Sequence, residues 1–221
     1  YFIADIAANH DGNFQKAIDL INFAKECGAD AAKFQHFNAE TIVSNKTFSE
    51  MSSKLSHQSS WEKSVYDVYK DASLNLEWTK KLELECKRIG IDFFTAPYSL
   101  DLIDYVNKYV CAFKVGSGDI TWIESIKKMA KKNKPIILAS GASSMKDVKR
   151  AVTSIKKINK KICLMQCNTN YTALDDNLKY INLNVLKSYR KNFPGVVLGL
   201  SDHTHGHSTV LGAITLGARM I

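Results

Sequence analysis

Short runs of hydrophobic residues alternate along the chain with longer stretches in which hydrophobic positions recur every three or four residues. Runs of the first kind are typical of buried strands, and spacing of the second kind is typical of helices with one buried face. The predicted strands cover residues 2–8, 31–35, 91–96, 112–116, 135–140, 162–167 and 195–200. The predicted helices cover residues 13–27, 100–108, 123–132, 144–158, 177–191 and 208–216. Strands that alternate with helices in this way predict a parallel sheet.

Seven such units, with an eighth strand beginning at residues 218–221, favour an α/β fold of the (β/α)8 or TIM barrel type over an open sheet. Neither a G-x-G-x-x-G fingerprint after the first strand nor a Walker motif is present, so the nucleotide-binding folds lose support. Barrels of this type take about 250 residues, whereas this chain has 221. We therefore expect one barrel domain over residues 1–221, truncated in or just before strand eight.

One connection between predicted elements is unusually long and runs from His36 to about Asn75. It is polar and rich in serine, and residues 61–69 have helical spacing with Trp61, Val65 and Val68 on one face. Long loops on the C-terminal face of a barrel often cover or build the active site. A lid over the site and a simple packing insertion are equally open interpretations.

Composition narrows the class of protein. Hydrophobic residues make up 45% of the chain and charged residues 24%, which is typical of a globular domain with a sizeable core. No apolar run is long enough to cross a bilayer, and the first residues lack the features of a signal peptide. The five cysteines are scattered without a C-x-x-C pair, so no disulfide framework is predicted. We expect a cytoplasmic protein without a membrane partner.

The formal net charge of +8 raises the question of nucleic-acid binding. Recognition of nucleic acid favours a basic stripe that is rich in arginine and interleaved with aromatic residues. Here most of the charge is lysine, spread over predicted helix faces such as residues 125–134 and 155–161. We interpret these lysines as solvated faces and expect no nucleic-acid partner. A modest preference for small anionic substrates stays open.

Chemistry in a barrel lies at the C-terminal ends of its strands, and two lysines stand out there. Lys33 and Gln35 share one face of the second strand, and Lys114 lies in the fourth. A lysine within an apolar strand must reach solvent or meet an anion, because an unpaired buried charge is very costly. Two such lysines on different strands suggest a shared anion.

Serine hydroxyls at neighbouring strand ends, together with glycine backbone N–H groups, extend this pattern to a pocket suited to phosphate or carboxylate. These serines are Ser117, Ser140 and Ser201. The alternative interpretation is a pair of structural salt bridges that the two lysines make with Asp5 and Asp119. Residue types alone place the anion site slightly ahead.

Three histidines follow the seventh strand, at positions 203, 205 and 207. His203 lies nearest the strand end and is the best candidate metal ligand, whereas the other two fall near the next helix and are interpreted as surface or packing residues. One histidine cannot hold a catalytic metal, so further ligands must come from elsewhere. His10, after the first strand, fits a functional or a structural role equally well.

Six short motifs occur in order on successive strands. They are Ile3-Ala-Asp-Ile-Ala-Ala-Asn-His-Asp-Gly12, Gly28-Ala-Asp-Ala-Ala-Lys-Phe-Gln35, Phe94-Thr-Ala-Pro97, Lys114-Val-Gly-Ser-Gly-Asp-Ile120, Ser140-Gly-Ala-Ser143 and Gly199-Leu-Ser-Asp-His-Thr204. With these motifs the sequence resembles the sialic acid synthase family, whose members make nonulosonic acids from phosphoenolpyruvate and an acylamino sugar. Each motif is short, but six in the correct order are highly specific.

The resemblance implies a transferase that performs an aldol-type condensation in a barrel domain. C3 of phosphoenolpyruvate would attack the aldehyde carbon of the open-chain sugar, water would add at C2, and phosphate would leave by C–O cleavage. A divalent metal, usually manganese, would bind and polarise the aldehyde. Fixed cationic side chains around the departing phosphate would supply electrostatic preorganisation.

The resemblance also implies a role for each matching residue. The residues that would bind substrate are Lys33, Thr95, Lys114, Ser117, Ser140, Thr169 and Ser201. The residues that would take a catalytic role are Asp5, Gln35, Lys114 and Tyr171, with Gln35 and Tyr171 facing the sugar. His203 would be a metal ligand. The family usually has glutamate where this chain has Asp5, and the shorter side chain would act as an acid/base group or a sugar contact.

The resemblance implies two further features beyond residue 221. In the family, a Glu-Lys-His-Phe motif supplies a carboxylate and the second metal-binding histidine. A small antifreeze-like domain then sends an arginine into the partner subunit's site. We therefore expect a longer enzyme that forms a homodimer.

Several functions stay open at this point. The acceptor could be N-acetylmannosamine or a bacterial diacetamido-trideoxy sugar. A related condensing enzyme, of the deoxy-heptulosonate type or another that uses a sugar phosphate, would need extra basic residues, which Lys46 or Lys54 could supply. A catalytically inactive barrel that only binds phosphoenolpyruvate is the rival of a different class, favoured by Asp5 and by the missing second histidine.

Overall fold

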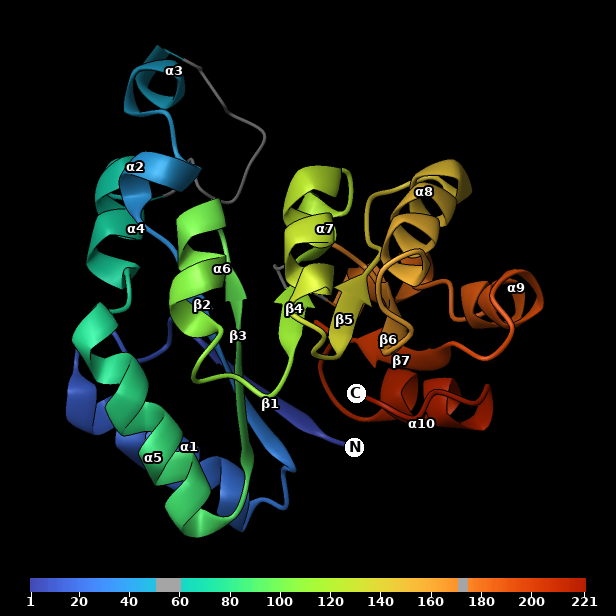
Figure 1. Ribbon diagram of the computed structural model, residues 1–221, viewed down its shortest axis with the longest axis horizontal. Coiled ribbons are helices and arrows are strands. Elements are labelled where there is room, and N and C mark those ends of the chain that lie inside the picture. Colours follow the sequence, from blue (N-terminus) through green and yellow to red (C-terminus); the bar gives the residue numbers. More distant parts are fainter. Residues whose placement is uncertain (51–60, 171–174) are drawn as a thin grey trace. The chain divides into compact units, whose positions relative to one another are not determined.

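The computed structural model describes residues 1–50, 61–170 and 175–221, and its chain divides into two compact units (Figure 1). One unit comprises Ala4–Val110, and the other comprises Cys111–Ile221 together with Tyr1–Ile3. Strands alternate with helices in both units, which confirms the predicted α/β class.

The unit Ala4–Val110 is built on three adjacent strands. In order they are β1 (Ile3–Ala7), β2 (Ala31–His36) and β3 (Asp92–Pro97). The helices of this unit are α1 (Phe14–Glu26), α2 (Ala39–Ile42), α3 (Asn45–Glu50), α4 (Val65–Ala72), the 3-10 turn η2 (Leu76–Trp78), α5 (Thr79–Ile89) and α6 (Leu100–Val106). β2 and β3 run parallel, with Lys33 opposite Phe94 and Gln35 opposite Ala96. α1 and α5 lie side by side (Figure 1).

The unit Cys111–Ile221 is built on four adjacent parallel strands. They are β4 (Phe113–Val115), β5 (Ile136–Ala139), β6 (Ile162–Cys167) and β7 (Val197–Ser201). Its helices are the 3-10 turn η3 (Ser117–Asp119), α7 (Ile123–Lys131), α8 (Met145–Lys156), the 3-10 turn η4 (Asp175–Tyr180), α9 (Val185–Asn192) and α10 (Ser208–Thr215). β5 and β6 are buried along their whole length. Continuous apolar runs of this kind are typical of parallel strands covered on both faces.

Side-chain caps fix where several helices begin. The Asn13 side chain accepts a hydrogen bond from the Lys16 backbone N–H at 3.1 Å and starts α1. Ser144 and Asp147 form a reciprocal capping box at the start of α8. Each cap is worth about 1 kcal/mol. Because the caps follow the strands closely, they also define the strand-end loops that carry the candidate site.

Residues 219–221 pair as the sequence predicts for the beginning of an eighth strand. Arg219 N–H donates to the Leu198 carbonyl at 2.7 Å, and Leu200 N–H donates to the Met220 carbonyl at 2.9 Å. On their other side, Ile221 N–H donates to the Tyr1 carbonyl at 3.0 Å. The short segment therefore lies between β7 and the first residues of the chain. A complete eight-stranded barrel stays a prediction.

The helix predicted over residues 177–191 is wrong in its first half. Residues 175–180 form a 3-10 helix instead, and α9 begins only at Val185. Asn182 and Asn184 lie between the two segments. Asparagine side chains compete for backbone hydrogen bonds and favour turns over helix interiors, which accounts for the break.

The long connection after β2 contains more helix than the sequence pattern predicted. The helix expected over residues 61–69 begins at Val65, where the Ser64 hydroxyl caps the Asp67 N–H, and continues to Ala72. α2, α3 and α5 were not predicted. α5 buries only Thr79, Leu82 and Cys86 among its largely charged residues, so its apolar signal is sparse. Residues 51–60 of this connection lie outside the described part, and its role as a lid stays a prediction.

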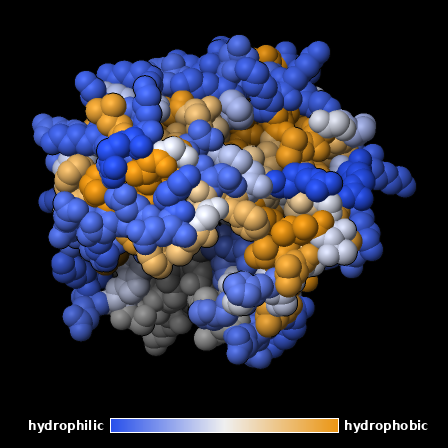
Figure 2. All heavy atoms as spheres, turned by 90° about the horizontal axis from the view of Figure 1, so that it is seen from below, coloured by the Kyte–Doolittle hydropathy of each residue, from blue (hydrophilic) through white to orange (hydrophobic). Residues whose placement is uncertain are grey.

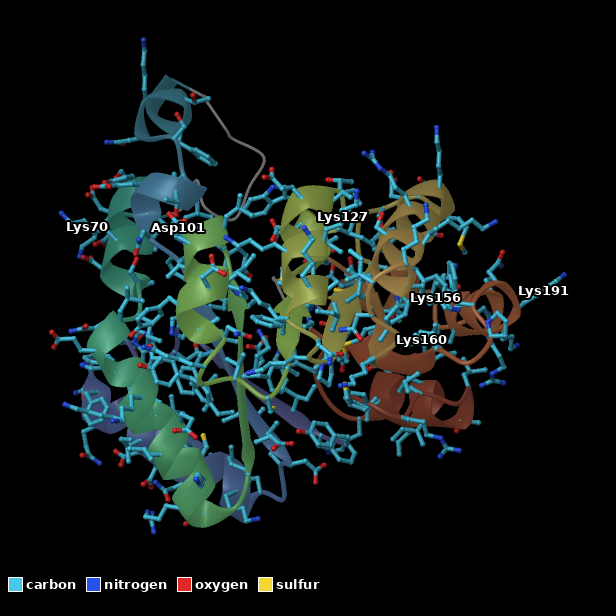
Figure 3. The ribbon with its side chains drawn as sticks, viewed as in Figure 1. Lys70, Asp101, Lys127, Lys156, Lys160 and Lys191 are labelled. Atoms are coloured by element: carbon cyan, nitrogen blue, oxygen red, sulfur yellow. The ribbon has the colours of Figure 1, made fainter. Side chains whose placement is uncertain are left out.

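The lysines of the surface are distributed as the sequence suggested. Lys70, Lys127, Lys156, Lys160 and Lys191 are exposed and come from five different segments (Figure 3). Figure 2 shows hydrophobic patches lying between hydrophilic side chains on the face that it presents. Among the described residues, no helix is both long and apolar enough to span a bilayer.

Candidate active site

The predicted site residues lie within strands or at strand ends in both units. In the unit Ala4–Val110, Lys33 lies within β2 and is only 5% exposed. Its Nζ pairs with a carboxylate oxygen of Asp5 at 2.6 Å, and the Asp5 side chain is 52% exposed. One of the two ion pairs that the sequence left open as an alternative, Lys33–Asp5, is therefore present. It neutralises the lysine from one side while the carboxylate stays accessible to solvent.

Gln35 lies two residues after Lys33 and on the same face of β2. Its side-chain Nε2 donates to the Tyr98 hydroxyl at 3.3 Å. The β3 residue opposite Gln35 is Ala96, which adds no polar group. The predicted pairing of Lys33 and Gln35 on one face is thus confirmed, and Tyr98 joins them as a residue that the sequence analysis did not single out.

Thr95 occupies the other face of the same strands. It is opposite Phe34 in the register, and its hydroxyl contacts His36 Nδ1 at 2.8 Å. His36 Nε2 contacts the Thr79 hydroxyl at 2.9 Å, and all three residues are fully buried. The structure therefore does not bring Thr95 together with Lys33 and Gln35, and substrate binding by Thr95 stays a prediction.

Burial lowers the pKa of His36 to about 3, and the charge of His10 contributes in the same direction. His36 is consequently neutral at physiological pH and holds α5 to β2 and β3 through its two threonine partners. His10 is fully buried as well. Its Nδ1 accepts the Gly12 N–H at 3.1 Å, and its ring packs edge-on against Trp78. The sequence left a functional and a structural role open for His10, and these contacts favour the structural role.

In the unit Cys111–Ile221, Lys114 is the central cation. It lies in β4 and is 7% exposed. Its Nζ donates to the Ser201 hydroxyl, at the end of β7, over 3.5 Å. The structure thus brings together one predicted lysine and one predicted serine from opposite edges of a four-stranded sheet.

Ser117 and Thr169 form a second pair of hydroxyls in this unit. Thr169 accepts the Ala142 N–H at 3.2 Å and donates to Ser117 at 2.8 Å. Gly141 makes this contact possible, because a Cβ there would lie 1.9 Å from the Thr169 hydroxyl oxygen and 2.4 Å from the Ser117 Cβ. Gly141 also has φ +39°, in the left-handed region. Since Thr169 donates to Ser117, the Ser117 proton is directed elsewhere.

Ser140 is buried at the end of β5. Its hydroxyl donates to the Met165 carbonyl at 3.0 Å, and the side chain also hydrogen bonds to Tyr189. Burial raises the pKa of Tyr189, and the bond to Ser140 partly offsets that rise. The Ser140 hydroxyl is thus already engaged within the protein.

Cys167 is a residue of the site that the sequence analysis missed. Its Sγ lies 4.0 Å from His203 Nδ1. Burial alone would raise the pKa of this thiol, but the hydrogen bond and charge of His203 outweigh that effect, with help from Lys114 and Ser117. The net result is a lowered pKa. The signal in the sequence was its position, as the last residue of a buried strand and directly before the polar residues 168–170.

The chain matches the model of a known protein family. The model of the NeuB family matches residues 20–221, which is most of the chain. The chain belongs to the NeuB family. This result agrees with the resemblance to sialic acid synthases that the strand-end motifs predicted.

Curated relatives of this NeuB-family chain carry the names of synthases. It is 31% identical to human N-acetylneuraminate-9-phosphate synthase, over all of this chain and 60% of that protein. It is 34% identical to N,N'-diacetyllegionaminic acid synthase of Campylobacter jejuni, over 99% of this chain and 65% of that protein. The chain therefore spans less than two thirds of the length of these relatives.

A solved structure supports the fold. The N-acetylneuraminic acid synthetase of Leptospira borgpetersenii matches with a TM-score of 0.85 and 24% identity, over 100% of this chain and 71% of that chain. At this identity the match establishes the fold alone. This NeuB-family chain thus has an α/β fold similar to that of sialic acid synthases.

The divalent metal predicted for this site needs several ligands close together. Among the described residues, no group of three or more His, Cys, Asp and Glu side chains is arranged to hold an ion. One imidazole, His203, beside one thiol falls short of the oxygen and nitrogen donors that manganese takes. The described residues of this NeuB-family chain therefore do not fit a divalent metal by themselves. Tyr171, the remaining predicted site residue, lies outside the described part of the chain.

Proposed function

We propose that this chain is part of a nonulosonic acid synthase that condenses phosphoenolpyruvate with an acylamino sugar and releases phosphate. Membership of the NeuB family supports the proposal, as do relatives named for the synthesis of neuraminic and legionaminic acids. Both relatives are named as synthases of acidic sugars, which supports a synthase as the enzyme class.

The observation that carries the proposal is the surroundings of Lys114. A buried ammonium group lies within reach of the Ser201 hydroxyl, and the same unit contains the Ser117–Thr169 pair. Cationic and hydroxyl donors fixed in a buried setting suit a small anion that carries phosphate and carboxylate groups. They also stabilise the charge that develops on a departing phosphate.

The remaining residues are assigned roles in the same reaction. Lys33 is assigned to the anionic groups of phosphoenolpyruvate, with Asp5 as an acid/base group or sugar contact beside it. Gln35 and Tyr171 are assigned to the sugar. Ser140 and Thr95 keep a proposed role in substrate binding, although both hydroxyls have partners within the protein.

The proposed chemistry balances as a condensation with hydrolysis. A new bond forms between C3 of phosphoenolpyruvate and the aldehyde carbon of the sugar, and water adds at C2. The C2–O bond to phosphate then breaks, which gives a 2-keto acid and inorganic phosphate. A divalent metal with His203 as one ligand stays a proposal, and its other ligands would have to come from outside the described residues. We also propose that the intact protein forms a homodimer in the cytoplasm, as expected from the sequence.

A phosphorylated acceptor is the second candidate, because the name of the human relative specifies a 9-phosphate product. Lys46, in α3, is exposed and could meet such a phosphate, whereas Lys54 lies outside the described residues. A barrel that binds phosphoenolpyruvate without turnover is the third candidate.

The test is phosphate release by the intact protein with phosphoenolpyruvate, manganese and a panel of acylamino sugars and their 6-phosphates. We expect release with one acceptor only, a loss of at least tenfold in Lys114→Ala, and no loss in the control Lys127→Ala, which changes an exposed lysine of α7. Binding of phosphoenolpyruvate without release for any acceptor would favour the inactive barrel. Absence of binding would contradict the proposed site.

A further inference from the structure

A cavity of about 400 Å³ lies where β7 begins, within the unit Cys111–Ile221. The end of α9, the connection from α9 to β7 and the first residues of β7 contribute to its lining (Figure 1). Val197 begins β7 and Ser201 of the candidate active site ends it, so roughly 13 Å of strand separates the two places. None of the predicted site residues that the structure describes lines this cavity.

Arg190 brings a fixed guanidinium group to the cavity. It lies in the last turn of α9, and its Nη2 donates to the Leu216 carbonyl at the end of α10. Gly217 has φ +92°, and a Cβ there would overlap the guanidinium. The glycine therefore makes room for the arginine. Within the described part of the chain that carbonyl is the hydrogen-bond partner of the Arg190 side chain, so most of its five N–H donors are left for a ligand.

Arg219 brings a second guanidinium group to the same cavity. Its backbone N–H donates to the Leu198 carbonyl at 2.7 Å, which fixes the residue beside the start of β7. Its side chain has no hydrogen-bond or ion-pair partner among the described residues. The described residues that line the cavity include no Asp or Glu, so the two cations have no counter-charge there. An anion bound between them would offset their mutual repulsion.

The rest of the lining is largely apolar. Phe193 and Leu198 are buried, whereas Val197 is 46% exposed, and Pro194 and Val196 add to the apolar wall. Sites for small molecules are typically cavities of about 300–1,000 Å³ with mostly apolar walls and a few placed polar groups. An apolar wall with two cationic groups fits this description and selects for a ligand that is both anionic and apolar.

We propose that this cavity binds an organic anion in which one carboxylate or phosphate group is attached to an apolar body. The anionic group accepts hydrogen bonds from Arg190 and Arg219, because the guanidinium fork matches the oxygen atoms of carboxylate and phosphate. The apolar body packs against Phe193 and Val197. A sugar acid does not fit, because its hydroxyl groups would lose water against an apolar wall. The site is independent of the reaction proposed above.

Three probes with six carbons each test the proposal on the intact protein. Hexanoate has the charge and the apolar chain, 1-hexanol lacks the charge, and gluconate carries the charge on a hydroxylated chain. The protein is labelled with ¹³C at valine methyl groups, and each probe is titrated by NMR. We expect saturable shifts of the Val196 and Val197 methyl signals with hexanoate. Hexanoate should bind about three- to tenfold tighter than 1-hexanol, the contribution of two exposed charge pairs.

Gluconate should bind more weakly than hexanoate by at least the same factor. Hexyl phosphate, titrated in the same way, decides between the two anionic groups, because the tighter of the two binders identifies the group that the arginines prefer. Equal affinity for hexanoate and gluconate would overturn the proposal, since it would indicate a site for any anion.

Substitution of one cation completes the test. Arg219→Gln changes an exposed side chain and should weaken the binding of hexanoate about threefold while leaving that of 1-hexanol unchanged. Lys191→Gln is the matched control, because it removes an exposed cation of α9 that does not line the cavity, and it should leave both affinities unchanged. Equal affinity for hexanoate and 1-hexanol, an equal loss in the control, or no saturable shift would overturn the proposal. The comparison of the probes on the unaltered protein decides the matter even if Arg219→Gln does not fold.

Discussion

A buried lysine needs a negative charge close by, and Asp5 provides one for Lys33. Its ammonium group is buried, whereas its partner Asp5 is half exposed. The pair is therefore shielded from solvent on one side only. An arrangement of this kind gives the buried ammonium group a counter-charge and leaves the carboxylate accessible to what binds beside it.

Replacing Asp5 with asparagine removes that negative charge. We expect Asp5→Asn to lower the free energy of unfolding by about 1–2 kcal/mol, between the values typical of exposed and of buried pairs. Urea denaturation measures the loss. The control is Asp71→Asn, which breaks the exposed Lys63–Asp71 pair at 2.7 Å and should change stability little. A loss in Asp5→Asn no larger than in the control would show that Lys33 does not depend on Asp5.

His36 makes stability depend on pH. Its folded pKa of about 3 lies below the ordinary value of 6.5 because the ring is buried. The unfolded chain therefore binds the extra proton first, and stability falls as pH drops below about 6.5 toward 3. Between pH 7 and pH 5 the expected loss from this group is about 2 kcal/mol.

The measurement compares unfolding free energies at pH 7 and pH 5. His36→Gln should show a loss on acidification that is smaller by most of that amount, even though its stability at pH 7 is lower. His205→Gln, which changes an exposed histidine, should behave as the unaltered protein does. If His36→Gln and the unaltered protein lose stability equally, His36 is not the group that titrates.

At the scale of single elements, the pairing of residues 219–221 with β7 depends on one glycine. A Cβ at Gly199 would lie 2.6 Å from the Met220 carbonyl oxygen and 3.0 Å from the Met165 side chain. Gly199→Ala therefore forces the two backbones apart, and we expect it to lower the unfolding free energy by about 1–3 kcal/mol. Thermal and urea unfolding measure the change.

Gly118→Ala is the matched control, because nothing lies within 4 Å of the corresponding Cβ position. It should be close to neutral. Faster hydrogen exchange of the Leu200 and Arg219 amides in Gly199→Ala, and not in the control, would locate the effect at this pairing. A neutral Gly199→Ala variant would mean that residues 219–221 pair with β7 only loosely.

Element type was predictable wherever the hydrophobic pattern was strong and the boundaries carried their own chemistry. β6 matches its predicted range of 162–167, and α8 begins at the capping residue Ser144. α5 was not predicted because only three of its residues are buried and most of the others are charged, so its hydrophobic pattern is weak. The helix expected at 177–191 failed because periodicity alone does not register the two asparagines that interrupt it.

The site was predictable only as far as strand alternation reaches. Lys33 and Gln35 share a face because they are two residues apart, whereas Lys114 in β4 meets Ser201 at the end of β7, on the opposite edge of the four-stranded sheet. Thr95 lies on the other face, beside His36, because of the register between β2 and β3, which the spacing within one strand does not give. Cys167 enters the site through its contact with His203, which depends on how the loop after β7 lies against the end of β6.

At the scale of the whole molecule, we propose that this NeuB-family chain belongs to an enzyme that breaks the C–O bond of phosphoenolpyruvate. The family match and the buried lysines support a condensing synthase. Neither observation concerns the bond that breaks. The identity of that bond separates the proposed condensation from ordinary hydrolysis of a phosphate ester and from binding without turnover.

The most direct measurement uses phosphoenolpyruvate labelled with ¹⁸O at the oxygen that bridges C2 and phosphorus. The intact protein is supplied with manganese and the acylamino sugar that supports turnover, and the released phosphate is examined by ³¹P NMR and mass spectrometry. We expect the phosphate to carry the label and a 2-keto acid with three additional carbons to form from the sugar. Phosphate without the label, or labelled phosphate without the new acid, would contradict the proposed condensation.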